Sequence, residues 1–140
     1  MTNHQATQSK ITIDSGTKWE ALASYSRAVR YGNQIYISGT TATDKAGNVV
    51  GEGDPAAQTH YIIDKFEQTL ERLESSLADV VRTRIYLRHV DDWEPVARAH
   101  GERFEAIRPA NTLVQALLVG DAYLVEIEAD VIIGAGGANK

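Results

Sequence analysis

The sequence contains no cysteine, and this absence removes several kinds of chemistry at once. Disulfides, thiolate nucleophiles and zinc–thiolate sites are all excluded. Long apolar runs are also missing, because no stretch approaches the roughly 18 apolar residues that a membrane-spanning helix requires. The first ten residues, MTNHQATQSK, lack the apolar segment of a secretory signal. We therefore expect a cytoplasmic protein without a membrane partner.

Positive charge is scarce as well. The chain has 14 lysine and arginine residues against 19 acidic ones, which gives a net charge of −5. Because nucleic-acid-binding domains usually present a basic surface, this balance disfavours a nucleic-acid partner. The sequence has no P-loop or dinucleotide-binding fingerprint, and its four histidines show no metal-ligand spacing. We expect no cofactor and no metal site.

The remaining composition is that of one globular domain. A chain of 140 residues with 43% hydrophobic residues is long enough for a single core. Residues 1–15 are polar and weakly patterned, and residues 134–140 are small and rich in glycine. We predict flexible tails over these two ranges and one domain over residues 16–133.

Short alternating segments predict strands. Residues 26–31 and 34–39 alternate in polarity, and Gly32-Asn33 between them is a two-residue hairpin signal. Two further strands are expected at about residues 111–119 and 124–133, joined through Gly120-Asp121.

Two helices are expected between these strands. Asp54 and Pro55 begin the first, because aspartate accepts from the free N–H groups of a first turn, where proline has no donor to lose. Its apolar residues recur at spacings of three and four and should pack on a sheet: Ile63, Phe66, Leu70, Leu73 and Leu77. Asp91 or Asp92 caps the second helix. The packed side of that helix is expected to hold Trp93, Val96, Ala97, His100 and Phe104.

Two strands carry opposite charges. The strand from Val80 to Leu87 is expected to place one set of side chains on its polar face: Arg82, Arg84, Tyr86 and Arg88. Its other face would hold Val81, Thr83, Ile85 and Leu87. In the last strand the polar face holds Glu126, Glu128 and Asp130. If these strands or their symmetry mates lie side by side, opposite-charge pairs contribute roughly 0.2–1 kcal/mol each. A solvent-exposed face and a face lining a subunit interface or pocket both stay open as alternatives.

Five blocks of residues follow one another in a recognisable order. They are Tyr25-Ser26-Arg27-Ala28-Val29, Ile37-Ser38-Gly39, Asp79-Val80-Val81-Arg82-Thr83, Arg108-Pro109-Ala110-Asn111-Thr112 and Val125-Glu126-Ile127-Glu128-Ala129. In this order they resemble the Rid family, the reactive intermediate deaminases that are also called YjgF-like or L-PSP-type proteins. The resemblance covers about residues 19–133. It implies a chorismate-mutase-like α+β fold, with a mixed sheet of about six strands covered by two helices on one face. It also implies a homotrimer with small-molecule clefts at the subunit interfaces.

The family's active members hydrolyse enamines and imines such as 2-aminoacrylate, and release ammonia and a 2-keto acid. In them an arginine at the position of Asn111 looks like the anchor for the substrate carboxylate. A guanidinium suits that role because its charged, planar fork binds a carboxylate through two hydrogen bonds. Asparagine is neutral and binds a carbonyl, amide or hydroxyl instead. The substitution predicts a substrate other than a typical amino-acid-derived imino acid.

The resemblance also implies roles for other residues of the site, and for most of them a purely structural role stays open as an alternative. Glu126 matches the glutamate associated with the attacking water, which needs a carboxylate within hydrogen-bond reach, and its alternative is an ion pair with an arginine. Tyr25 matches the pocket tyrosine, which bonds or stacks on substrate, but a structural aromatic before a strand fits equally. Gly39 matches a position of close backbone approach, with a simple strand-end glycine as the alternative. Thr112 is ordinary for the family and completes the expected substrate-binding set.

The second helix departs from the family pattern. Many members have an asparagine there, followed three residues later by a tyrosine, and the equivalents here are Ala97 and His100. A second polar pocket group is therefore expected to be lost. Arg98 and Arg108 are the candidates for supplying the charge that Asn111 lacks, although Arg108 is also frequent in active members.

Two functions remain on these grounds. The first is a Rid-type hydrolase that uses Glu126 and a water at a subunit interface on a C=N substrate whose carboxylate is absent or bound elsewhere. The alternative is a non-catalytic trimer that binds or senses a small molecule. A ribonuclease, the label attached to some relatives, is disfavoured by the acidic balance and by the lack of an aromatic and basic stripe.

Overall fold

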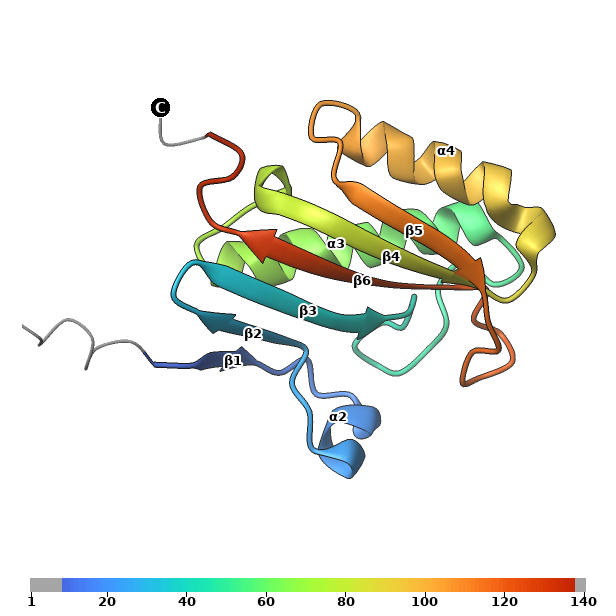
Figure 1. Ribbon diagram of the computed structural model, residues 1–140. Coiled ribbons are helices and arrows are strands. Elements are labelled where there is room, and N and C mark those ends of the chain that lie inside the picture. The colour runs from blue at the N-terminus through green and yellow to red at the C-terminus, as the bar shows by residue number, and fades with distance from the viewer. Residues whose placement is uncertain (1–8, 138–140) are drawn as a thin grey trace, which may run out of the picture.

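The computed structural model describes residues 9–137, which form a six-stranded sheet flanked by helices. The strands are β1 (Ile11–Ile13), β2 (Ala28–Tyr31), β3 (Gln34–Thr40), β4 (Val80–Leu87), β5 (Ala110–Gln115) and β6 (Val125–Ile132). The helices are α2 (Lys18–Ala23), α3 (Pro55–Arg72) and α4 (Trp93–Phe104), with 3-10 turns η1 (Leu77–Asp79) and η2 (Val90–Asp92). The strand order is β1-β2-β3-β6-β4-β5, and β4 and β5 are parallel while the other neighbours are antiparallel (Figure 1).

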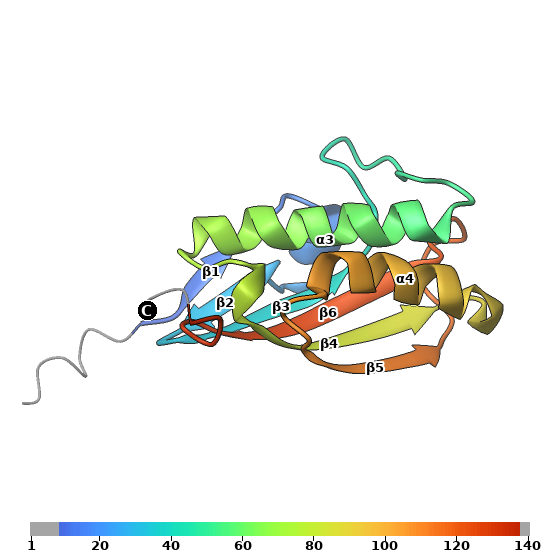
Figure 2. The same ribbon diagram turned by 90° about the horizontal axis from the view of Figure 1, so that it is seen from above.

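The two long helices lie on the same side of the sheet. Figure 2 shows α3 and α4 side by side over one face, while no element of the described chain covers the opposite face. This arrangement confirms the expected α+β class, with a mixed six-stranded sheet and two helices on one face. The hairpin prediction is also confirmed, because Tyr31 pairs with Gln34 around a two-residue turn.

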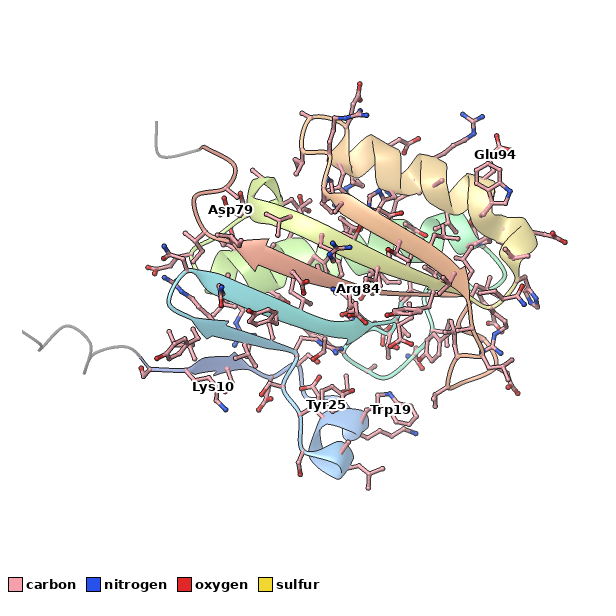
Figure 3. The ribbon with its side chains drawn as sticks, in the orientation of Figure 1. Lys10, Trp19, Tyr25, Asp79, Arg84 and Glu94 are labelled. Atoms are coloured by element: carbon pink, nitrogen blue, oxygen red, sulfur yellow. The ribbon has the colours of Figure 1, made fainter. Side chains whose placement is uncertain are left out.

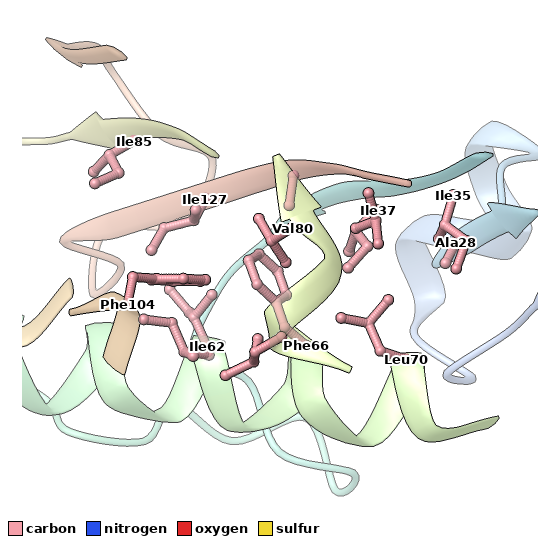
Figure 4. Close-up of a cluster of buried hydrophobic side chains, with 14 of the residues drawn as sticks. Ala28, Ile35, Ile37, Ile62, Phe66, Leu70, Val80, Ile85, Phe104 and Ile127 are labelled. Atoms are coloured by element: carbon pink, nitrogen blue, oxygen red, sulfur yellow. The ribbon is translucent and has the colours of Figure 1, made fainter. Parts of the chain in front are cut away.

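The core lies between α3 and the sheet. Phe66 and Leu70 on the helix are buried against Ile37 and Ile127 of the central strands (Figure 4). Full burial of such a side chain contributes roughly 1.5–3 kcal/mol, so the packing of α3 on the sheet stabilises the fold. Ile63 of the predicted stripe is buried as well.

The ends of α3 follow from local chemistry. The Asp54 carboxylate accepts from the Ala57 N–H at 3.0 Å, which confirms the predicted start. The apolar stripe predicted a helix through Leu77, but α3 ends at Arg72 and Glu74 has a φ of 63°. Leu77 still reaches the core from η1, because the turn after the helix continues over the same face.

The packed side of α4 begins one turn later than predicted. Trp93, the first residue of the helix, is 54% exposed, whereas Val96 is fully buried. Ala99, which the prediction omitted, is buried as well. Asp92, one of the two residues expected to cap α4, does precede the first residue of the helix. Its side chain makes no capping hydrogen bond, because the η2 turn leads directly into the helix.

Opposite charges on β4 and β6 do lie side by side. Arg84, labelled on the sheet in Figure 3, forms ion pairs with Glu128 at 3.2 Å and with Asp130 at 3.3 Å. On the buried face, β6 alternates as predicted. In β4 a register shift next to Val81 breaks the predicted alternation, so that Val80 is buried in place of Val81.

The predicted tails extend too far into the fold. Residues 11–13 form β1 against β2, and Ile13 is buried, because edge pairing with β2 overrides the polar composition of this segment. After β6 the buried Asp79 carboxylate accepts from the N–H groups of Gly134 and Gly136 at 3.2 and 3.0 Å. The outer parts of both predicted tails, residues 1–8 and 138–140, lie outside the described residues.

The strand predicted at residues 111–119 is shorter than expected. β5 ends at Gln115, and Ala116 donates its N–H to the carbonyl of Leu87, the last residue of β4. Beyond that point β5 has no partner strand, so residues 116–124 leave the sheet as a loop. Arg88 holds this loop by donating to the carbonyls of Leu118, Gly120 and Tyr123.

Candidate active site

A β-bulge shapes the sheet where β3 lies beside β6. The pairing register shifts between Ile37 and Thr40, so Ser38 and Gly39 lie in the bulge. The Ser38 hydroxyl donates to the Ser26 carbonyl at 2.7 Å, and the Thr40 hydroxyl donates to the Ser38 carbonyl at 2.7 Å. Bulges redirect strands and recur beside active sites, and this one brings the Gly39 backbone towards β6.

Glu126 of β6 occupies the space beside Gly39. A Cβ added at position 39 would overlap the Glu126 carboxylate and lie 3.2 Å from its Cδ. Any side chain larger than glycine would therefore displace the carboxylate. The structure thus brings Gly39 and Glu126 together, and the requirement for glycine comes from the carboxylate itself.

Glu126 is half-buried, and burial raises its pKa, while the positive charge of Arg27 acts in the opposite direction and Glu128 adds to the rise. Among the described residues Glu126 forms no ion pair; Arg84 pairs instead with Glu128 and Asp130. A carboxylate with a raised pKa and free oxygens has the properties of a general base.

Glu126 lines a cavity of about 260 Å³, here called the small cavity. Tyr25 and Gly39 line it too, so three of the residues expected at the site meet there. Trp19 and Leu22, from α2, form an apolar part of the wall; Trp19 and Tyr25 are labelled around α2 in Figure 3. Ligand pockets usually measure roughly 300–1,000 Å³, so this volume suits a very small molecule.

Two cations that the sequence did not single out also line the small cavity. Arg27 is only 5% exposed and donates from Nη2 to the Gly39 carbonyl at 2.7 Å, and its guanidinium lies 5.8 Å from the Tyr25 ring centre. Lys65 of α3 donates to the carbonyls of Thr41 and Thr43, each at 2.9 Å. Burial, together with repulsion from Arg27, lowers the pKa of Lys65 to about 8.

A second group of predicted residues lies around β5 and α4. Asn111 of β5 donates from its side chain to the Thr83 hydroxyl at 2.9 Å, across the parallel β4–β5 pair. The same hydroxyl is 2.9 Å from His100 Nε2, and the His100 ring lies 4.6 Å from that of Phe104. Burial lowers the pKa of His100. Asn111 and His100 are thus joined through Thr83, which the sequence did not identify.

These two groups are separate within one chain. Asn111 and His100 are not among the residues that line the small cavity, and neither are Thr112 and Ala97. Thr112 is exposed on the edge strand β5, and Ala97 is partly exposed on α4. The structure therefore places the predicted site residues in two groups, of which only one lines the small cavity.

The arginines considered as replacements for the missing charge lie elsewhere. Arg98 is exposed and pairs with Glu94 at 2.6 Å along α4. Arg108 is exposed and has a φ of 55° in the turn before β5. Neither lines the small cavity, where Arg27 and Lys65 are the cations. The sequence offered one indication that Lys65 could lie near the core. This charged residue comes directly before Phe66, a buried residue of the apolar stripe.

The described part of the chain offers neither a cluster of metal ligands nor a membrane-spanning helix. Between residues 9 and 137, no three histidine or acidic side chains are grouped so that they could bind a metal ion. In the same range no helix is long and apolar enough to span a membrane.

Known proteins share this fold and sequence. The family model described as Endoribonuclease L-PSP matches residues 16–133. The 3-aminoacrylate deaminase RutC of Acinetobacter baylyi is 35% identical over 118 residues, which cover 84% of this chain and 93% of the relative. The uncharacterized protein SCO2049 of Streptomyces coelicolor is 34% identical over 124 residues, which cover 88% of this chain and 92% of the relative.

A solved structure agrees with these sequence matches. Rv2704 from Mycobacterium tuberculosis, a member of the YjgF/YER057c/UK114 family, superimposes with a TM-score of 0.81 at 37% identity. The match covers 89% of this chain and 100% of Rv2704. The chain therefore belongs to the Endoribonuclease L-PSP family, the group of the YjgF and Rid proteins.

Proposed function

We propose that the protein is a Rid-type hydrolase that converts a small imine, enamine or related C=N compound into a carbonyl compound and ammonia. The observation that carries this proposal is Glu126, a half-buried carboxylate with a raised pKa that lines the small cavity and has no ion-pair partner among residues 9–137. The deaminase activity named for the RutC relative is consistent with it.

Glu126 acts twice in the proposed reaction. In the first step it accepts a proton from water while the water oxygen bonds to the C=N carbon, and it passes this proton to the nitrogen, which gives a carbinolamine. In the second step Glu126 accepts the proton of the carbinolamine hydroxyl and gives it to the nitrogen, as the C–N bond breaks and the C=O bond forms. Water and the imine are consumed, and ammonia and the carbonyl compound are released. Since water is the nucleophile, the reaction requires no cofactor.

The substrate differs from a typical amino-acid-derived imino acid in this proposal. Asn111 stands at the position where active relatives carry the carboxylate-binding arginine, and its amide already donates to Thr83. Ala97 and His100 replace the polar helix pair of many relatives, and His100 is held against Phe104. Tyr25, Gly39 and Thr112 complete the proposed binding set.

A homotrimer would bring the two groups of site residues together. No element of the described chain covers the sheet face opposite α3 and α4, and this face carries an aromatic side chain, Tyr36, that is 48% exposed. The edge strand β5 is exposed over most of its length. We propose that this face packs against neighbouring copies, and that each cleft joins Glu126 of one chain to Asn111 of another, in a cytoplasmic protein.

The reaction is tested with imines generated in situ from alanine or leucine by an amino-acid oxidase. We expect little acceleration of imine loss by the wild type and a gain by Asn111→Arg, because the guanidinium restores a carboxylate anchor. In that background Glu126→Gln should remove the activity, typically by a factor of about 10²–10⁴. Glu128→Gln is the matched control, since Glu128 lies on the same strand face but binds Arg84.

Two results would count against the proposal. Robust wild-type hydrolysis of these imines would show that the arginine is dispensable. Activity of Asn111→Arg that survives Glu126→Gln would remove Glu126 from the mechanism.

The alternative is a non-catalytic trimer that binds or senses a small molecule. The observation that favours it is the Asn111 side chain, which donates to Thr83 in place of a ligand. Inactivity of both the wild type and Asn111→Arg, together with measurable binding of a small molecule, would support this alternative.

A further inference from the structure

The small cavity shares a wall with a second, larger one. The larger cavity measures about 370 Å³ and lies beside α3, between the segment after β1 and the loop after β3. Arg27 and Lys65 line both cavities. We call these two residues the cationic wall.

Arg27 has hydrogen-bonding capacity that the protein does not use. The residue is 5% exposed, and its Nε is buried without a partner among the residues that the structure describes, although Nη2 donates to the Gly39 carbonyl. An unpaired buried donor is costly, and a guanidinium offers five donors in a planar fork. The unused donor of this buried guanidinium is therefore suited to bind an acceptor that comes from outside the chain.

Lys65 adds a second charge with a free donor. Its ammonium group has three N–H bonds, and two of them are directed to the carbonyls of Thr41 and Thr43. Burial and the charge of Arg27 lower its pKa to about 8, while Glu20 and Asp44 oppose that shift from further away. The Glu20 carboxylate is itself occupied by donors from Ser15 and Thr17.

The charge of this region is opposite to that of the whole chain. The chain carries a net charge of −5, yet cations outnumber carboxylates in the lining of both cavities. In the described residues, neither Arg27 nor Lys65 takes part in an ion pair. Two like charges held together without a bound carboxylate form a site for an anion.

We propose that the cationic wall binds a carboxylate of the ligand and so supplies the anion anchor that Asn111 does not provide. The inference rests on the proposed function in placing the ligand in the small cavity, next to Glu126. It makes the substrate a small acid whose carboxylate lies on the Arg27 side of the reacting carbon. Such a substrate presents its carboxylate from a different direction than one anchored at position 111.

The test uses stable oxo acids and their uncharged amides. Pyruvate and 4-oxopentanoate differ in the spacing between carboxylate and carbonyl, and each is titrated calorimetrically beside its amide into the full chain near pH 7. We expect 4-oxopentanoate to bind about tenfold or more tightly than its amide, because the amide lacks the charge, whereas pyruvate, the oxo acid of the alanine imine, should show no such preference. Lys65→Gln and Arg27→Gln should each remove most of that preference and leave amide binding unchanged.

Matched controls separate the cationic wall from general charge effects. Arg72→Gln removes a cation that lines only the larger cavity, and Arg98→Gln removes one on the exposed side of α4, so both should bind as the wild type does. If Arg27→Gln fails to fold because its bond to Gly39 is lost, Lys65→Gln still decides the question.

The proposal is overturned if 4-oxopentanoate binds no better than its amide, or if Arg98→Gln weakens acid binding as much as Lys65→Gln does. A failure of the anion-site proposal can be told apart from a failure of the proposed hydrolase function. Preferential acid binding that depends on Lys65, without imine hydrolysis by any variant, would retain the anion site and reject the catalytic role of Glu126.

Discussion

Glu126 and Glu128 lie two residues apart on one face of β6, but their surroundings differ. Glu128 accepts from Arg84 at 3.2 Å and from the Tyr86 hydroxyl at 2.9 Å. The hydrogen bond to Glu128, with burial, raises the pKa of Tyr86. Glu126 has no such donors in the described part of the chain, and burial raises its own pKa. At the scale of single residues, one carboxylate stabilises the sheet and the other is held ready for a ligand.

Substitution of these two residues should therefore have opposite effects on stability. When the pKa of a carboxyl rises on folding, the folded state loses stability as the pH increases from the unfolded pKa through the folded one, because the ionised form is the less favourable one in the fold. Glu126→Gln is expected to be as stable as the wild type or more so in urea unfolding at pH 7. Glu128→Gln should lose up to about 1 kcal/mol, because its ion pair is partly exposed. Strong destabilisation by Glu126→Gln would indicate a structural role instead.

Lys65 should make stability depend on pH in the alkaline range. Its pKa falls from 10.5 to about 8 on folding, so between these values the unfolded chain binds more protons and the folded state gains stability as the pH rises. Urea unfolding at about pH 7.5 and 9.5 should show this gain, and Lys65→Met, which does not titrate, should lack it. An equal pH response in both proteins would contradict the burial of the charge.

At the scale of elements, α3 connects stability with the site. The helix carries Phe66 and Leu70 into the core, and it positions Lys65 in the cationic wall. Its first turn depends on the Asp54 carboxylate, which accepts from Ala57. Changes at this cap therefore alter the stability of the helix without touching the cavities.

Asp54→Ala is expected to reduce the free energy of unfolding by about 1 kcal/mol, because the first turn loses its side-chain acceptor. Asp54→Asn retains an acceptor oxygen and should stay close to the wild type. Urea unfolding measures both, and oxo-acid binding should be unchanged in each. Equal stability of Asp54→Ala and the wild type would show that the cap is dispensable.

Elements with strong local patterns were predictable from the sequence, while those made by tertiary pairing were not. The β2–β3 hairpin and α3 follow from Gly32-Asn33 and from the apolar stripe. The sequence did not predict β1, because its three residues form a strand only by pairing with β2. It did not predict α2 either, because six residues are too few to show a helical repeat of apolar positions. Both β-bulges depend on neighbouring strands, so no local pattern predicts them.

The candidate site divides in the same way. The positions of Gly39 and Glu126 followed from short motifs, and the structure brings them together. Arg27 lines the cavity from the residue before β2, and Lys65 lines it from α3. These two segments are distant in sequence, so no local pattern links them. The link from Asn111 to His100 depends on Thr83 in a parallel strand pair, which sequence spacing does not reveal.

At the scale of the whole molecule, the uncovered sheet face sets the expected assembly. Light scattering should give a mass three times the 15.3 kDa of one chain. Tyr36→Glu places a charge on that face and should shift the mass downward, whereas Ala46→Glu adds the same charge in an exposed loop and should not. A monomeric wild type would rule out clefts between subunits.

β6 is the last strand of the described chain, yet it lies in the centre of the sheet between β3 and β4. During synthesis the ribosome therefore releases β3 and β4 long before the strand that joins them. Until β6 emerges, each has an unpaired edge, and the apolar stripe of α3 covers an incomplete surface. Contacts between such distant segments slow folding, so a nascent chain of this protein reaches its native state only after β6 has emerged.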